Sequence, residues 1–183
     1  MEFANQAAWD EWLRGNHDDS PGVWLMIAKK GAPRPTVTQA EAIEAALCHG
    51  WIDGQLARHD EHFYKQRFTH RRPRSKWSQI NRERATTLIE AGIMAPGGLE
   101  EVEKAKADGR WEAAYESQSN ATVPPDFARA LAANPEAEAF FATLTGVRRY
   151  AFLYRIQDAK RPETRAKRIA RFTELLARRE TLN

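Results

Sequence analysis

The sequence is poor in cysteine and in long apolar runs. Cys48 is the only cysteine among 183 residues, so an intrachain disulfide and a zinc site with several cysteine ligands are excluded. The longest apolar run, from Val23 to Ala28, is far shorter than the roughly 20 residues that cross a bilayer, so we expect no membrane insertion. The first residues lack the basic start and the apolar stretch of a secretory signal, so we expect a cytoplasmic protein.

Familiar catalytic and cofactor motifs are also missing. The chain has no GxxxxGK[ST] phosphate loop, no dinucleotide-binding glycine pattern, no HExxH and no GxSxG. His59 and His62 are three residues apart, but they fall in an expected turn without an evident third ligand. We therefore predict no metal site and no cofactor, and the sequence leaves open whether the chain is an enzyme.

Charge is present in blocks, although the net charge is only +3. Residues 1–62 carry five Lys or Arg against ten Asp or Glu (−5), and residues 97–138 carry four against nine (−5). Residues 63–84 carry eight against one (+7), and residues 146–183 carry eleven against four (+7). If the two basic segments meet in space, they form one positive surface. If they do not, each is a solvated face with local ion pairs.

The hydrophobic pattern predicts an α+β fold, with a small antiparallel sheet packed with helices and a helical C-terminal half. Residues 23–30 read as a strand, and residues 51–58 and 62–70 read as a β-hairpin with a three-residue connection. We expect residues 1–74 to form the sheet-containing region. Residues 75–183 are expected to form a helical region that packs with the first as one unit.

The register of the hairpin follows if Arg58 pairs with His62. This register places Asp53 opposite Arg67 on a polar face of the sheet. The other face carries apolar side chains such as Ile52 and is expected to cover the core.

Helix boundaries carry recognisable signals. Thr38 and Glu41 have the spacing of a capping box, and Gly50 sits where a helix C-cap needs positive φ. Asn134 followed by Pro135 is typical of a helix start. In the C-terminal half the longer helices are expected at residues 75–91, 99–108, 147–159 and 162–179.

A candidate anion site lies where the second hairpin strand leads into a helix. Free backbone N–H groups and the positive end of the helix dipole favour an anion there, and arginine binds phosphate or carboxylate through two parallel hydrogen bonds. With one residue from the second basic segment, the predicted ligand site contains Trp51, Asp53, Arg67, Arg71, Arg72, Trp77, Ser78 and Arg165. Asp53 would orient Arg67, and Trp51 or Trp77 would provide an apolar wall.

A structural role for the same residues is the alternative. In that case Trp77 belongs to the core, Ser75 and Ser78 only cap the helix, and the arginines pair with Asp53 and Glu44.

Cys48 lies four residues after Glu44, which suggests a thiol beside a carboxylate. The C-terminal end of a helix opposes thiolate formation, and a neighbouring carboxylate raises the pKa of the thiol. We therefore predict that Cys48 is a buried structural residue and not a nucleophile.

An ordered set of residues resembles the YdeI/OmpD-associated, or bacteriocin-protection, proteins. The set consists of Trp9, Trp12, Gly22 to Leu25, Lys29, Lys30, Glu44, Leu47, Cys48, Gly50 to Gly54, Arg67 to Thr69, Arg71, Arg72, Ser75, Trp77, Ser78, Asn81, Gly92, Met94, Gly98, Leu99, Ala107 to Trp111, Ala159 to Arg161, Glu163 to Arg165, Arg168 and Ile169. The resemblance implies a role in resistance to bacteriocins or cationic antimicrobial peptides, with association with the envelope or an outer-membrane porin. It implies no reaction and no catalytic set.

The leading hypothesis is a stress- or antimicrobial-resistance-associated protein of unknown molecular mechanism, with a basic pocket for a small anionic ligand. A nucleic-acid-binding module is the alternative, because the pI is about 9.1 and aromatic residues interleave the basic segments. A third hypothesis is an enzyme with Asp53 or Glu44 as general base. Basic segments around a cleft favour the ligand site, a broad basic stripe favours nucleic acid, and a carboxylate in an enclosed cavity favours the enzyme.

Overall fold

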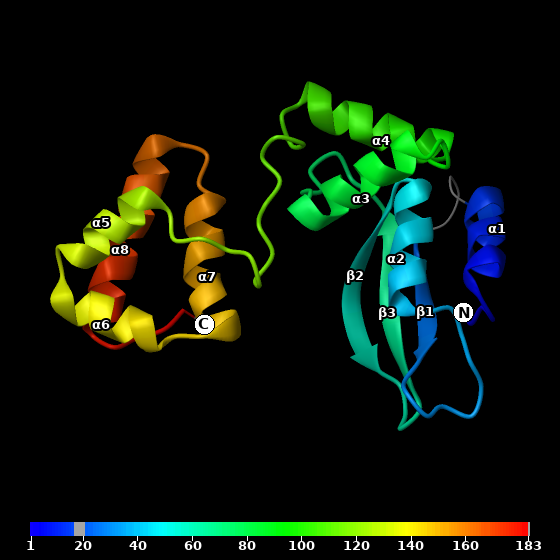
Figure 1. Cartoon of the computed structure of the whole chain (residues 1–183), viewed down its shortest axis with the longest axis horizontal. Helices are drawn as coiled ribbons and strands as arrows, with labels where there is room; N and C mark the ends of the chain where they lie inside the picture. The colour runs from blue at the N-terminus through cyan, green and yellow to red at the C-terminus, as the bar shows by residue number, and fades with distance from the viewer. Residues whose placement is uncertain (17–20, 183) are drawn as a thin grey trace. The chain divides into compact units, whose positions relative to one another are not determined.

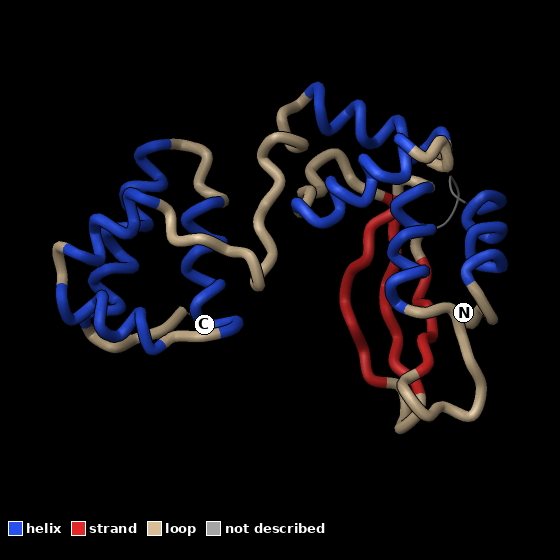
Figure 2. Tube along the Cα trace, viewed as in Figure 1, coloured by secondary structure: helices blue, strands red, loops and turns tan. Residues whose placement is uncertain are grey.

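The computed structural model describes residues 1–16 and 21–182 and confirms the α+β class (Figure 1). The three strands lie in the first half of the chain and the second half is helical, as predicted (Figure 2). The elements are α1 (Gln6–Asn16), β1 (Val23–Ala28), α2 (Gln39–Cys48), β2 (Trp51–Arg58), β3 (Phe63–His70), α3 (Gln79–Glu90), α4 (Pro96–Ala107), α5 (Pro125–Ala132), α6 (Pro135–Thr143), α7 (Gly146–Gln157) and α8 (Pro162–Ala177). Within the two described ranges, no helix combines the length and apolar character that a membrane crossing requires.

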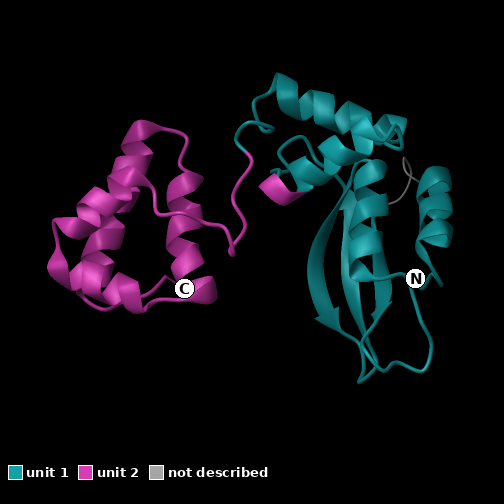
Figure 3. Ribbon diagram, in the orientation of Figure 1, with its two compact units in different colours: residues 1–77, 81–113 teal, residues 78–80, 114–183 magenta. Residues whose placement is uncertain are grey.

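The chain divides into two compact units (Figure 3). The first contains residues 1–77 and 81–113, and the second contains residues 78–80 and 114–183. Helix α4 and most of α3 therefore belong with the sheet, whereas the sequence analysis grouped residues 75–183 together. That the two predicted regions pack as one unit stays a prediction.

The strands form one antiparallel sheet in the order β1-β3-β2, and the predicted hairpin register is wrong by one residue at its start. Asp53 pairs with Phe68 and not with Arg67. At the other end of the hairpin Arg58 pairs with Tyr64, so the connection is longer than the three residues that were expected.

Two local features set this register. The Asp60 carboxylate accepts hydrogen bonds from the backbone N–H groups of His62 (2.8 Å) and Phe63 (2.7 Å), which stabilises the longer loop. Gly54 and Gln55 of β2 then lie opposite a single residue of β3, which makes a β-bulge. The bulge adds a second residue to the shift, so a register that assumes regular pairing cannot be right at both ends.

The shift exchanges the two faces of β2 ahead of the bulge, at residues 51–53, and the extra residue at the bulge restores the predicted faces after it. Asp53 and Trp51 share the face of Phe68, which is fully buried under helices, because residues paired across antiparallel strands point to the same side. Arg67 pairs with Trp24 of β1, and both lie on the opposite face. The predicted polar face that combines Asp53 with Arg67 therefore does not form.

Each unit has its own apolar core. Helices α1 and α2 cover one side of the sheet (Figure 1), and the buried residues there are Trp9, Leu13, Val23, Leu25, Ile27, Val37, Ala42, Ala45, Ala46, Trp51 and Phe68. In the second unit α5 to α8 enclose Phe127, Leu131, Ala137, Phe141, Leu144, Phe152, Leu153, Ile156, Phe172 and Leu176. Phenylalanine rings in this second core meet edge to face, with centroids 5.3 to 6.3 Å apart.

The predicted capping signals are confirmed. The Thr38 hydroxyl accepts the Glu41 N–H (3.3 Å), and the Glu41 carboxylate accepts the Thr38 N–H (2.8 Å). Gly50 has φ of 76° directly after the C-cap of α2. Asn134 caps α6, with Pro135 at its first position.

Candidate functional site

The predicted ligand residues fall in both compact units. Ser78 and Arg165 belong to the second unit, and the other six belong to the first. Three of those six are buried, namely Trp51, Arg71 and Trp77. The guanidinium of Arg71 lies against the ring of Trp77, and we call these two residues the tryptophan–arginine cluster.

Arg71 is fixed at the end of β3. Its backbone N–H donates to the carbonyl of Gly50 (3.1 Å), and its Nη1 donates to the carbonyl of Lys76 (3.3 Å). The guanidinium lies 3.7 Å from the ring centroid of Trp77, and only 6% of the residue is exposed. A desolvated guanidinium over an indole is worth up to about 2 kcal/mol. Arg71 therefore positions Trp77 and adds positive potential to a buried region.

Two buried indole N–H groups have no acceptor, that of Trp77 in this cluster and that of Trp51 in the core of the sheet. Trp51 and Trp77 are each 1% exposed, and among the described residues neither Nε1 has a hydrogen-bond partner. The ring of Trp51 packs against that of His70, with centroids 4.4 Å apart, and the ring of Trp77 packs against that of Trp111, with centroids 4.9 Å apart. An unsatisfied buried donor costs about 1–3 kcal/mol, so both positions favour an acceptor from outside the chain.

A hydrogen-bonded basic turn lies between Arg71 and Trp77. The Arg72 N–H donates to Ser75 Oγ (2.8 Å), the Ser75 N–H donates to the Arg72 carbonyl (2.8 Å), and Pro73 holds the second position of the turn. Arg110 Nη1 donates to the Ser75 carbonyl (3.0 Å). In the described part of the chain, the guanidinium groups of Arg72 and Arg74 make no ion pair or hydrogen bond. The turn thus presents two positive charges on a fixed backbone.

Asp53 is engaged with a buried amide and not with an arginine. Gln66 is 2% exposed, and its Nε2 donates to Asp53 Oδ2 (3.1 Å) while its Oε1 accepts from Gln39 Nε2 (3.0 Å). Sequence reasoning missed Gln66 and Gln39. The available signal was Gln66 between the aromatic residues Tyr64 and Phe68 on the core face of β3.

Arg67 lies on the open face of the sheet. Its Nη2 donates to the Pro21 carbonyl (2.9 Å), and its guanidinium is 5.9 Å from the ring centroid of Trp24. Lys65 lies on the same face, two residues earlier on β3. An aromatic ring flanked by two cations therefore occupies this face.

The two predicted residues of the second unit have partners there. Arg165 donates to both Asp126 oxygens (2.6 and 2.8 Å) and to the Ile156 carbonyl (2.9 Å). These bonds hold the pKa of Asp126 below its usual value. Ser78 forms a parallel β-bridge with Tyr115. Arg165 therefore joins three helices, and its donors would have to leave these partners before they could bind an anion.

Cys48 is buried, as predicted. Burial, followed by the charges of Asp10 and Glu44, raises the pKa of its thiol to about 11. Asp10 Oδ1 lies 2.8 Å from Nε2 of the buried His49, a pair that sequence reasoning missed. Glu44 is exposed and accepts from Gln6 Nε2 (3.2 Å).

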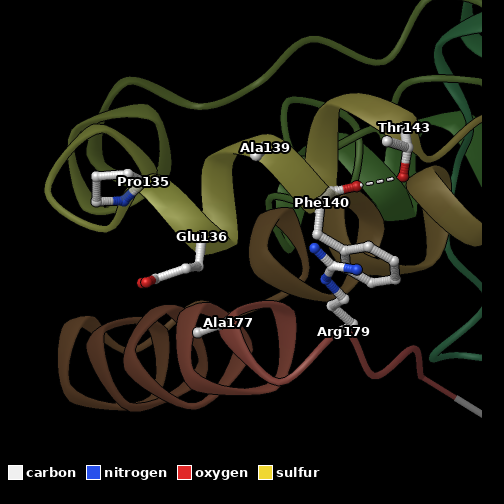
Figure 4. A pocket seen from close by; sticks show the side chains of 7 residues that line it. All are labelled: Pro135, Glu136, Ala139, Phe140, Thr143, Ala177 and Arg179. Atoms are coloured by element: carbon white, nitrogen blue, oxygen red, sulfur yellow. Dashed lines mark hydrogen bonds between the residues drawn. The ribbon is translucent and has the colours of Figure 1, made fainter.

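Two cavities of the second unit were not anticipated. One, of about 630 Å³, lies between α6 and the end of α8, where Arg179 and Phe140 sit side by side (Figure 4). The other, of about 720 Å³, lies between α7, α8 and the C-terminal residues. Neither lining includes any of the eight predicted residues.

Two known families match different parts of the chain. The family described as "Domain of unknown function (DUF8412)" matches residues 1–101. The family described as "Bacteriocin-protection, YdeI or OmpD-Associated" matches residues 120–179, which supports the resemblance seen in the sequence. No curated protein and no solved structure gives a significant match.

Proposed function

This chain belongs to the family described as a domain of unknown function (DUF8412), and from this premise, with the match of residues 120–179 to the bacteriocin-protection, YdeI or OmpD-associated family, we propose a resistance-associated protein that binds a small anion. The anion is bound at the tryptophan–arginine cluster. The family description supports the resistance role, and the association with the envelope or a porin is proposed on the same basis.

The observation that carries the binding proposal is the buried indole N–H of Trp77 beside the guanidinium of Arg71. Trp77 offers a donor only, and Arg71 adds a charge that is always positive. A water molecule would satisfy an indole but would bring two donors of its own that need acceptors. A carboxylate supplies acceptors without donors, and a phosphate supplies at least two unprotonated oxygens and a negative charge, so either anion suits this site better.

Removing one indole N–H tests the proposal. Inorganic phosphate and acetate are titrated into the protein by calorimetry, and Trp77→Phe keeps an aromatic ring while it removes the donor. We expect at least one of the two anions to bind and the variant to bind it about tenfold more weakly, because a hydrogen bond to a charged group contributes about 1.5–3 kcal/mol.

Trp111→Phe is the matched control, since Trp111 packs against Trp77 but its Nε1 is not among the buried unsatisfied donors. Both variants are checked by thermal unfolding. Equal affinity of Trp77→Phe and the wild type, or no binding of either anion, would contradict the proposal.

A survival assay with bacteria that lack the gene tests the resistance role. Deletion of the gene should increase killing by a bacteriocin, and the wild-type gene should restore survival. Trp77→Phe at equal protein level should not restore it if the anion site is needed. Unchanged survival of the deletion strain would contradict the resistance role. It would not bear on the anion site, which calorimetry tests separately.

Nucleic-acid binding is the second candidate, favoured by the cations beside Trp24 on the open sheet face and by the basic turn. Arg71→Lys and Arg74→Ala separate the candidates at two salt concentrations. A small-anion site should lose affinity with Arg71→Lys, because lysine keeps the charge but not the planar fork. A nucleic-acid surface should tolerate that change, lose affinity for a short duplex with Arg74→Ala, which removes an exposed charge of the basic turn, and show a steep salt dependence.

A further inference from the structure

The cavity between α7 and α8 has the features of a second binding site, and we propose that it binds a small phosphomonoester with an apolar group. Its volume of about 720 Å³ lies within the range of small-molecule sites. Arg155, Arg168 and Arg171 line it, together with apolar side chains. All of these residues belong to the second unit, so the site is distinct from the tryptophan–arginine cluster and goes beyond the proposed function.

The positive charge of the cavity is not cancelled by its two carboxylates. Asp158 Oδ2 lies 4.0 Å from Arg168 Nη1, and Glu180 Oε1 lies 3.3 Å from Nε of Arg178, which is outside the lining. Each carboxylate therefore has a cation beside it. Within the described residues the guanidinium of Arg171 makes no ion pair or hydrogen bond. Arg171 is thus available to an anionic ligand.

The two arginines of α8 are arranged to act together. Arg168 and Arg171 are three residues apart on the helix, so their side chains leave the same face. Arg168 is held by the bond from its Nη1 to the Arg155 carbonyl, which fixes one side of its guanidinium. Two guanidinium groups, one of them fixed in advance, suit the several acceptor oxygens of a phosphate monoester.

The lining also offers apolar side chains to an apolar group on the ligand. Phe172 is buried below the cavity, and Leu175 and Leu182 are half-buried beside it. Leu182 lies beside the cavity because the chain reverses direction after α8. Arg179 adopts φ of 58°, and the Glu180 N–H donates to the Leu175 carbonyl (2.9 Å). Inorganic phosphate alone would leave this apolar wall without a partner.

Calorimetry of the full-length protein with phenyl phosphate tests the proposal. We expect phenyl phosphate to bind at least fivefold more tightly than inorganic phosphate, because its ring contacts the apolar wall. Arg171→Gln should weaken phenyl phosphate at least tenfold, and Arg171→Lys should weaken it by a smaller factor. Lys167→Gln is the matched control: it removes one charge from the same helix outside the lining, and should leave affinity unchanged.

Four results would overturn the proposal. They are the absence of phenyl phosphate binding, equal affinity of Arg171→Gln and wild type, equal losses in Arg171→Gln and Lys167→Gln, and a loss in Trp77→Phe as large as that in Arg171→Gln. Equal losses in Arg171→Gln and Lys167→Gln, together with tighter binding of hexathymidylate than of phenyl phosphate, would identify a nucleic-acid surface in place of the cavity. The fourth would assign the ligand to the tryptophan–arginine cluster. Thermal unfolding of each variant confirms that an exposed arginine was replaced without loss of the fold.

Discussion

Burial controls the chemistry of individual side chains in this protein, and Cys48 is a clear example. The residue is 8% exposed at the end of α2, and burial is the main reason that the pKa of its thiol rises to about 11. Nearby Asp10 and Glu44 act in the same direction, because a negative charge disfavours a thiolate. At neutral pH this thiol is therefore protonated, which agrees with a structural role.

We predict that Cys48 makes the folded state less stable in alkali. The pKa in the folded state is raised above that of an unfolded cysteine, so the folded chain binds more protons between about pH 9 and 11. The free energy of unfolding should then fall across this window by about 1–2 kcal/mol. Urea unfolding at several pH values measures this fall, and Cys48→Ala should make it smaller.

The same variant checks that the thiol has no catalytic or binding role. At pH 7, Cys48→Ala should reduce the free energy of unfolding by about 1 kcal/mol and leave anion binding intact. Loss of binding with the fold retained would show that the residue does more than pack.

At the scale of elements, α2 and α4 approach each other through a glycine. A Cβ at Gly98 would overlap the backbone carbonyl oxygen of Cys48, and the same oxygen accepts the Ala95 N–H (3.1 Å). Backbone on both sides leaves little room for adjustment. Gly98 is therefore required by helix packing and not by an unusual φ.

We predict that Gly98→Ala lowers the free energy of unfolding by about 2–4 kcal/mol, as expected for overpacking against backbone. Gly15→Ala is the control, since Gly15 lies in α1 with nothing within 4 Å of its added Cβ. The control should gain about 0.5–1 kcal/mol from lower backbone entropy in the unfolded chain. Urea unfolding followed by tryptophan fluorescence compares the two, and equal effects would refute the close approach.

Arg165 links α8 to α5 and α7, and Arg165→Lys should weaken this link. Lysine keeps the charge but cannot donate to both Asp126 oxygens and the Ile156 carbonyl together. We expect a loss of about 1–2 kcal/mol, reduced by partial exposure of the pair. The pKa of Asp126 is lowered in the folded state, so this stabilisation is present above about pH 4 and is lost as the pH falls.

A chevron analysis at pH 7 and pH 3 tests this prediction. The difference in free energy of unfolding between the wild type and Arg165→Lys should be smaller at pH 3 than at pH 7, because Asp126 is then largely protonated in the unfolded chain. Lys167→Ala, an exposed change on the same helix, should show no such pH dependence.

Local signals predicted the elements well, whereas contacts between elements were not predictable. The capping box of Thr38 and Glu41 and the Asn134 cap involve residues within three positions of each other, so spacing reveals them. The hairpin register depended on the Asp60 loop and on the bulge at Gly54, and alternation of apolar residues does not report either. The faces of residues 51–53 of β2 were exchanged for that reason.

The candidate site was predictable only in part. The residue types of the Arg71 to Trp77 segment indicated a basic, aromatic region, and the structure does stack Arg71 on Trp77. Which donors are left without acceptors depends on packing in three dimensions. The pairing of Arg165 with Asp126, 39 residues away, had no signal in the sequence.

At the scale of the whole molecule, the tryptophans report on one unit only. All six, Trp9, Trp12, Trp24, Trp51, Trp77 and Trp111, lie in the first unit, while the second unit is helical and contains tyrosine. Tryptophan fluorescence therefore follows unfolding of the first unit, and far-ultraviolet circular dichroism follows helices of both.

The second unit has a core built entirely from residues 121–182, so we predict that a fragment of residues 114–183 folds alone. It should show a helical spectrum and a cooperative thermal transition. In the full chain, coincident fluorescence and dichroism transitions would mean that the two units unfold together, as expected if they pack as one. Separate transitions, with one matching the fragment, would mean that each unit is stable by itself. A fragment without cooperative unfolding would show that this core needs residues 78–80, whose Gln79 N–H donates to the Tyr115 carbonyl (2.9 Å).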